Sequence, residues 1–195
     1  MLKIHTLTLG LYQTNTYIAH DSNAQKCVII DPGYEAHTIL DKLEELELEP
    51  EAILLTHGHF DHVGAVKDIA AETGCRVYIH PDDLTLPPMM TAGKLYYTDT
   101  YTEGTQLHLA GLDISVLDTP GHTPGSVCLI CEKVMFSGDT LFAGSCGRTD
   151  LGGSWPQIQN SLHRLSSIEA DFVVFPGHGE STTLADEKRY NPYMR

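Results

Sequence analysis

Short apolar runs, most of them stopped by glycine, proline or aspartate, alternate with polar stretches along the chain. Continuous apolar runs at residues 27–30 and 52–55 are typical of buried strands, and the three-to-four-residue spacing of apolar positions from 37 to 48 predicts an amphipathic helix. We expect Pro50 to close this helix. The expected strands are residues 4–9, 16–19, 27–30, 52–55, 76–80, 106–109, 113–117, 126–131, 134–137 and 172–175, and the further expected helices are 63–73, 156–168 and 184–190.

The order of these elements indicates the fold class. Strands come early and late in the chain, with helices between and after them, which predicts an α/β sandwich of sheets covered by helices on both sides. The 195 residues suit one domain, residues 1–195, and 42% hydrophobic residues supply a sizeable core. Residues 81–102 and 140–155 show no clear period and are expected to be loops, which at this length are usually functional or disordered.

Composition narrows the class of protein. A net charge of −14 disfavours binding to nucleic acid or to an anionic membrane, because both depend on basic patches. No apolar run reaches the roughly 18 residues of a membrane span, and residues 1–5 read directly into a strand without a signal-peptide core. Five cysteines scattered through strand-like segments indicate reduced thiols. We therefore expect a cytoplasmic protein; the sequence leaves the oligomeric state open.

Histidine and aspartate follow four of the expected strands. The chain leaves a strand and reaches in turn His57, His122, Asp139 and His178. In open α/β sheets, sites form beyond the carboxyl ends of strands, so we expect these four positions to converge. Residues 57–62 add His59, Asp61 and His62 on the same short stretch.

These seven donors exceed the three protein ligands of a catalytic zinc ion and suit two divalent metal ions, with zinc expected first and iron or manganese as alternatives. In the expected arrangement one ion takes His57, His59 and His122, the other takes Asp61, His62 and His178, and Asp139 bridges them. A metal lowers the pKa of its bound water to about 7, which makes hydroxide available at neutral pH. Asp61 is also expected to orient that nucleophile.

The run 57–62, together with His122, Asp139 and His178, resembles the metallo-β-lactamase superfamily. Residues 121–126, 138–142 and 176–179 look like its glyoxalase II (hydroxyacylglutathione hydrolase) branch, and the resemblance extends from about residue 14 to residue 192. It implies a four-layer αββα sandwich with the dinuclear site at one edge. It also implies hydrolysis of a small anionic thioester, such as S-lactoylglutathione, to lactate and glutathione by a metal-bridging hydroxide.

The substrate end of the site follows the family less closely. Full-length glyoxalase II has a helical C-terminal domain that contributes basic residues to glutathione binding, and this chain ends soon after His178. Arg148 matches a basic residue of the family and is the candidate for binding a substrate carboxylate. Tyr96 and Tyr97 either line the substrate mouth or pack their loop down. In its length, the chain is similar to the short one-domain glyoxalase II-like proteins or to the persulfide dioxygenases.

Other interpretations stay open at this point. A persulfide dioxygenase would use one iron at His57, His122 and Asp139, and other hydrolases of the superfamily, such as lactonases, remain alternatives. A non-enzymatic metal scaffold is disfavoured because structural zinc sites are closed and four-coordinate. Asp31 is either a turn residue or a partner that orients a metal-binding histidine. Cys128 and Cys131 lie in an expected strand on opposite faces, which favours core packing over a metal pair.

Overall fold

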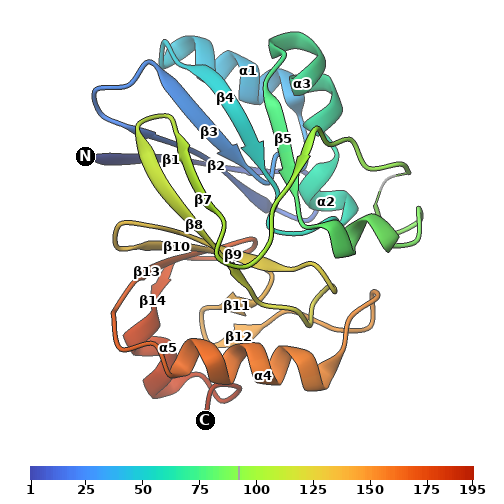
Figure 1. Cartoon of the computed structure of the whole chain (residues 1–195), viewed down its shortest axis with the longest axis vertical. Coiled ribbons are helices and arrows are strands. Elements are labelled where there is room, and N and C mark those ends of the chain that lie inside the picture. Colours follow the sequence, from blue (N-terminus) through green and yellow to red (C-terminus); the bar gives the residue numbers. More distant parts are fainter. Residues whose placement is uncertain (92) are drawn as a thin grey trace.

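Two six-stranded sheets lie face to face, and helices cover the outer face of each (Figure 1). The computed structural model describes residues 1–91 and 93–195. The N-terminal half of the chain forms the first sheet and the helices that cover it. The C-terminal half forms the second sheet and the helices that cover that sheet. This arrangement confirms the four-layer αββα sandwich that the resemblance implied.

The first sheet has the order β1-β2-β3-β4-β5-β6. Its first three strands pair antiparallel, and β3 to β6 pair parallel. The strands are β1 (Leu2–Leu9), β2 (Thr14–Asp21), β3 (Lys26–Ile30), β4 (Glu49–Leu54), β5 (Arg76–Ile79) and β6 (Asp99–Thr100), and the helices between them are α1 (Ala36–Glu45), α2 (Phe60–Val63), α3 (Val66–Thr73) and the 3₁₀ helix η1 (Pro81–Thr85).

The second sheet has the order β14-β13-β10-β9-β8-β7 and is antiparallel except for the parallel pair β10–β13. Its strands are β7 (Gln106–Leu109), β8 (Leu112–Asp118), β9 (Val127–Cys131), β10 (Val134–Gly138), β13 (Val173–Pro176) and β14 (Thr182–Thr183). The remaining elements are the short hairpin β11 (Leu141–Phe142) and β12 (Ser145–Cys146), and the helices α4 (Trp155–Ser166) and α5 (Leu184–Tyr190).

Three separate apolar cores hold the four layers together. Alternate side chains of each strand point to opposite faces, so Ile29 packs under α1 and α3 while Val28 packs between the sheets. A third core, which includes Ile158 and Leu162, lies between the second sheet and α4 and α5. The same alternation separates the two strand cysteines: Cys128 belongs to the outer core and Cys131 to the inner one. Their opposite facing confirms the expectation of core packing.

The two sheets are joined at one edge by hydrogen bonds. Val127 donates its backbone N–H to the carbonyl of Thr56 at 2.9 Å, and Asn15 donates to the carbonyl of Gly177 at 2.8 Å. The hydroxyl of Tyr17 reaches across to the carbonyl of Pro176 at 2.5 Å. These contacts bring the carboxyl ends of β4 and β13 to the same edge, and the end of β10 lies there too, since Gly177 donates to the carbonyl of Gly138 at 2.8 Å.

Two boundaries differ from the sequence-based expectation. The helix expected over residues 63–73 begins only at Val66, as α3, and the separate short helix α2 ends at Val63. Ala65 donates to the carbonyl of Pro32, and a Cβ on Gly64 would lie 2.3 Å from the carbonyl oxygen of Gly33, so the turn after β3 presses into this segment and interrupts it. The loop expected over residues 81–102 contains η1 and β6.

The expectation that Pro50 closes the first helix was wrong. Helix α1 ends at Glu45, and Glu47 then adopts a left-handed conformation with φ of 55°. Leu48 donates to the carbonyl of Leu43 and so completes the helix end. Pro50 lies inside β4 opposite Cys27, where the register with β3 shifts, as suits a residue without an N–H.

Among the described residues, no helix is both long enough and apolar enough to cross a membrane.

Replacing Gly33 by alanine tests the contact between this turn and the segment after β4. A Cβ at Gly33 would lie 1.7 Å from the carbonyl oxygen of Asp61, so we expect Gly33→Ala to lower the free energy of unfolding by about 3 kcal/mol or more. Gly74→Ala is the control: its Cβ meets nothing within 4 Å, and only its φ of 71° is unfavourable, at a cost of about 1 kcal/mol. Denaturant unfolding compares the two. Equal stabilities would contradict the close packing.

Candidate metal centre

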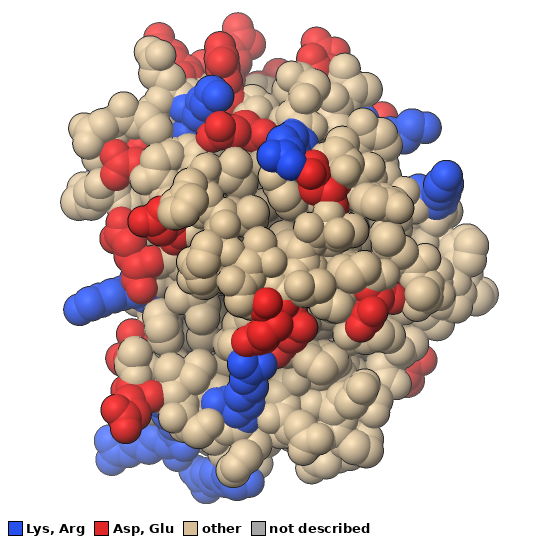
Figure 2. All heavy atoms as spheres, viewed as in Figure 1, with Lys and Arg blue, Asp and Glu red and all other residues tan. Residues whose placement is uncertain are grey.

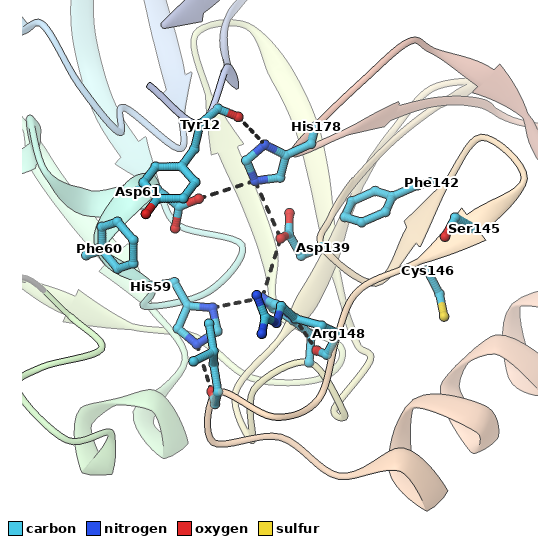
Figure 3. A pocket seen from close by; sticks show the side chains of 12 residues that line it. Tyr12, His59, Phe60, Asp61, Asp139, Phe142, Ser145, Cys146, Arg148 and His178 are labelled. Carbon is cyan, nitrogen blue, oxygen red and sulfur yellow. Dashed lines mark hydrogen bonds and ion pairs between the residues drawn. The ribbon is translucent and has the colours of Figure 1, made fainter. Parts of the chain in front are cut away.

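The seven predicted donors gather at the edge where the two sheets meet. Figure 3 shows His59, Asp61, Asp139 and His178 around the cavity at this edge. His57 and His59 follow β4, Asp61 and His62 lie in α2, His122 follows β8, Asp139 follows β10 and His178 follows β13. A Cβ on Gly177 would lie 2.2 Å from Asp139 Oδ1, so the backbone before His178 can approach Asp139 only because this residue is glycine.

Six of the donors form two clusters, and within each cluster the ligand atoms lie within 4.8 Å of one another. The first cluster is His57, His59 and His122, and the second is Asp61, His62 and His178. Asp139 lies between them: its carboxylate is 3.4 Å from His62 Nε2, 3.4 Å from His122 Nε2 and 3.6 Å from His178 Nε2. The two groups agree with the arrangement expected from the sequence, and a third group that was not expected consists of Asp31, His57 and His62.

The outward-facing nitrogen of each histidine has a hydrogen-bond acceptor. His122 Nδ1 lies 2.7 Å from the carbonyl of Arg148, and His59 Nε2 lies 2.9 Å from the carbonyl of Leu151. His178 Nδ1 lies 3.1 Å from the carbonyl of Tyr12. Because carbonyl oxygens only accept, these three ring nitrogens must carry the proton.

Asp31 performs the same task for the remaining two histidines. Its carboxylate accepts hydrogen bonds from His62 Nδ1 at 3.0 Å, from the Thr56 hydroxyl at 2.6 Å and from the Thr56 backbone N–H at 2.8 Å. The Thr56 oxygen in turn lies 3.1 Å from His57 Nδ1 and can accept its proton. Of the two interpretations left open for Asp31, the geometry favours the one in which it orients histidines.

In the first cluster, where burial keeps the rings neutral, the inward-facing nitrogens therefore present lone pairs. His59 Nδ1 and His122 Nε2 face each other at 2.8 Å, and His62 Nε2 and His178 Nε2 at 3.3 Å. His57 Nε2 and Asp139 Oδ1 are buried without a hydrogen-bond partner among the described residues. The two lone pairs of His59 and His122 repel at this distance unless a cation lies at the cluster, whereas between His62 and His178 a proton can take that place. The donor set thus fits a divalent metal ion at each cluster, since neutral imidazoles and carboxylates are the ligand forms.

The charge states of the first cluster suit metal binding. Burial lowers the pKa of His57, His59 and His122, which keeps these rings neutral. Burial opposes the charge on Asp139, but His62 and His122 outweigh it and hold the pKa of that carboxyl below its ordinary value.

The second cluster differs in its protonation. Burial also disfavours the charged form of His62, yet Asp139 and Asp31 outweigh it and place the pKa of His62 well above its ordinary value. The pKa of His178 is raised as well, because its contacts with Asp61 and Asp139 outweigh burial. Metal binding at the second cluster must therefore displace protons.

A cavity of about 490 Å³ opens over both clusters. Its apolar wall consists of Tyr12 and Phe60, which stack edge to face at 5.4 Å, and of Phe142, which packs against His178 (Figure 3). Helix α5 supports the Phe142 side: Gly144 donates to Glu187 at 2.8 Å, and Asn191 donates to the carbonyl of Ser145 at 2.9 Å.

The predicted substrate residues do not all lie at this cavity. Arg148 lines it, and its guanidinium forms two hydrogen bonds of 2.5 Å with the carboxylate of Asp150, which lowers the pKa of Asp150 to about 2. Tyr96 and Tyr97 instead line two other hollows, beside Val63 and Leu84 respectively. A contact between these two rings and a substrate stays a prediction without geometric support.

Sequence reasoning missed the carbonyls of Tyr12, Arg148 and Leu151, and the aromatic wall. Every residue carries a carbonyl, so no sequence signal distinguishes the three that orient histidines. Of the aromatic wall, Phe60 could have been identified from the sequence, because it stands between the candidate ligands His59 and Asp61.

Comparisons with known proteins agree with this geometry. Residues 9–178 match the family model described as the metallo-beta-lactamase superfamily. Hydroxyacylglutathione hydrolase GloC of Haemophilus influenzae is 34% identical over 209 residues, which cover 99% of this chain and 98% of that protein. The crystal structure of BLEG-1 B3 metallo-beta-lactamase is 35% identical, with a TM-score of 0.90 over 100% of this chain and 99% of that one. TTHA1623 in a di-iron-bound form is 38% identical, with a TM-score of 0.86 over 97% and 99%.

Removing one ligand tests the division into two clusters. We expect His178→Ala to bind about one metal ion per chain where the unaltered protein binds about two, because the first cluster keeps its three histidines. His163→Ala, an exposed histidine of α4, is the control and should bind as many ions as the unaltered protein. Metal analysis after dialysis measures both. Retention of two ions by His178→Ala would show that the second cluster is assigned incorrectly.

Proposed function

The chain belongs to the metallo-β-lactamase superfamily, whose members are generally metal-dependent hydrolases, and from this premise we propose that it is a dinuclear thioester hydrolase of the glyoxalase II type. Its proposed reaction is the hydrolysis of S-lactoylglutathione, or a similar small anionic thioester, to the acid and the thiol. The observation that carries the proposal is the pair of opposed histidine clusters with Asp139 between them.

The proposed chemistry divides between the bound ions and the chain. Two divalent ions, zinc first and iron or manganese as alternatives, supply Lewis acidity, a water of lowered pKa and local positive charge. The Asp61 carboxylate lies 3.3 Å from His178 Nε2. Burial raises the pKa of Asp61, but the contact with His178 outweighs burial and lowers this pKa below its ordinary value. This carboxylate can accept a hydrogen bond from the attacking water and so hold one lone pair of that water toward the cavity.

Two features of the cavity support a thioester with an anionic group. The wall of Tyr12, Phe60 and Phe142 is apolar and suits the carbon and sulfur atoms around the scissile bond. Arg148 stands at the same cavity and can pair bidentately with a carboxylate. The similarity to GloC of Haemophilus influenzae, described as a hydroxyacylglutathione hydrolase, supports the same substrate class.

The surface charge and the free cysteines support the proposed partner class and compartment. On the face shown in Figure 2, Lys and Arg side chains lie beside Asp or Glu or at the margin, and they form no broad basic patch there. This distribution supports a small-molecule substrate and neither a nucleic acid nor a membrane as partner. The five cysteines are all free, which supports the reducing conditions of the cytoplasm.

Turnover of S-lactoylglutathione by the metal-loaded protein tests the proposed activity. We expect hydrolysis, and we expect His59→Ala to reduce kcat/KM at least about 100-fold, because it removes one ligand of the first cluster. The rate of hydrolysis is followed by the loss of thioester absorbance. A chromogenic cephalosporin and a glutathione persulfide are assayed in parallel as comparison substrates, the persulfide by its oxygen uptake. Turnover no faster than that of His59→Ala would exclude this substrate. One iron per chain with oxygen uptake would instead favour the persulfide dioxygenase.

Substitution at Arg148 and Asp150 tests the substrate anion. We expect Arg148→Ala to raise KM for the anionic thioester by about tenfold with little change in kcat, because it removes binding that is equal in the ground and transition states. Asp150→Asn should lower the same KM by about fivefold or less, since it releases an exposed guanidinium from its intramolecular partner. Steady-state kinetics with a neutral thioester is the control. Equal changes for both substrates would contradict a role for Arg148 in binding the anion.

A further inference from the structure

Asp83 is a fully buried carboxylate outside the cavity. It lies in η1, the 3₁₀ helix that follows β5, and its exposed fraction is 0%. Burial of a carboxylate is costly unless hydrogen bonds compensate for the lost water. Burial accordingly raises the pKa of Asp83, although its hydrogen bonds act in the opposite direction. A charged group in such a place requires an explanation in terms of its partners.

The three partners of Asp83 are neutral donors from two separate segments of the chain. Asp83 Oδ2 accepts from the backbone N–H of Gly58 at 2.7 Å and from the hydroxyl of Thr123 at 2.9 Å. Asp83 Oδ1 accepts from the backbone N–H of Gly125 at 2.6 Å. Each carboxylate oxygen is therefore used, and the carboxylate bridges residues 56–62 to residues 119–126.

These partners are immediate neighbours of the first cluster. Gly58 stands between His57 and His59, and Thr123 directly follows His122. One carboxylate thus fixes the two segments that supply all three ligands of this cluster. Asp83 contacts no ligand of the second cluster, where Asp31 contacts His62 and the Tyr12 carbonyl contacts His178; Asp31 also reaches His57 through Thr56.

The packing around Asp83 leaves little freedom. A Cβ at Gly125 would lie 2.8 Å from Asp83 Oδ1 and 2.9 Å from the Asp83 backbone nitrogen. A Cβ at Gly58 would lie 3.4 Å from Asp83 Cβ. Both segments therefore approach the carboxylate through glycine, which allows short, direct hydrogen bonds to the backbone.

We propose that Asp83 is a positioning residue that sets the separation between the His57–His59 segment and the His122 segment, and thereby the metal affinity of the first cluster. It touches neither a ligating nitrogen nor the lining of the cavity. The proposal rests on metal binding at the first cluster, which is part of the proposed function, and it is independent of which substrate is hydrolysed.

Asparagine at this position would keep the shape of the side chain and break the match of donors and acceptors. Whichever way the amide is turned, its NH₂ group faces a backbone N–H, either that of Gly58 or that of Gly125. At least one segment then loses its hydrogen bond, and the distance between the two segments is no longer fixed. The neighbouring Asp82 has an exposed side chain, so Asp82→Asn makes the same change of charge without this effect.

Cobalt titration of the metal-free protein tests the proposal. We expect Asp83→Asn to weaken one Co²⁺ binding step by about tenfold or more, to change the visible spectrum of that ion, and to leave the other step within about twofold of the unaltered protein. Asp82→Asn should match the unaltered protein in both steps. Unchanged affinities and spectrum in Asp83→Asn would overturn the proposal, and so would equal weakening of both steps, because the hydrogen-bond partners of Asp83 directly adjoin ligands of the first cluster and none of the second.

A second pair of variants covers the case in which Asp83→Asn does not fold. Thr123→Val removes the hydroxyl that donates to Asp83 and that also lies 2.8 Å from the Ser126 hydroxyl, and Thr123→Ser keeps both contacts. We expect Thr123→Val to weaken the same binding step several-fold and Thr123→Ser to restore it; equal affinities in the two variants would overturn the proposal. Failure of the unaltered protein to bind Co²⁺ at all would refute the metal site itself, which is a distinct result.

Discussion

Mutual repulsion between imidazole lone pairs is the constraint on which this structure depends. Carbonyl acceptors around the rim fix the proton of His59 and of His122 on the outer nitrogen, so the inner nitrogens of these two neutral rings have only lone pairs to offer one another. At 2.8 Å, the separation of His59 Nδ1 and His122 Nε2 is unfavourable without a cation. The protein therefore expends folding free energy to assemble a site that a metal ion then stabilises.

That assembly requires rigid supports, and the fold supplies them from both sheets. Strand ends from two different sheets can carry donors to one point only if the sheets are tied together there, which the contacts of Val127 with Thr56 and of Asn15 with Gly177 achieve. Close approach then depends on glycines, such as Gly33 against the backbone of Asp61 and Gly177 against Asp139. Three apolar cores hold the remaining layers and leave this edge free for polar groups.

The sequence predicted the layers and the gathering of the seven candidate donors, because both are encoded locally. An apolar run that stops at a polar residue shows where a strand ends, and four such endings converge by the general rule for α/β sheets. Features that arise from contact between distant residues were not predictable. The helix break at Gly64 comes from the carbonyl of Gly33, and Pro50 entered a strand because a register shift accommodates it. Asp83 gave no signal, since its partners are mostly backbone groups of another segment.

The segment from Arg148 to Leu151 links the substrate end of the site to the metal end. Its first and last carbonyls accept hydrogen bonds from His122 and His59, while the Arg148 side chain lines the cavity and pairs with Asp150. Any backbone shift that moves the guanidinium toward a substrate also moves the carbonyls that orient two ligands of the first cluster. Under the proposed function, substrate specificity and metal affinity are therefore coupled through this segment. A chain that alters its anion contact by changing this segment's backbone must keep both carbonyls in place, whereas a change of side chain at position 148 or 150 leaves them undisturbed.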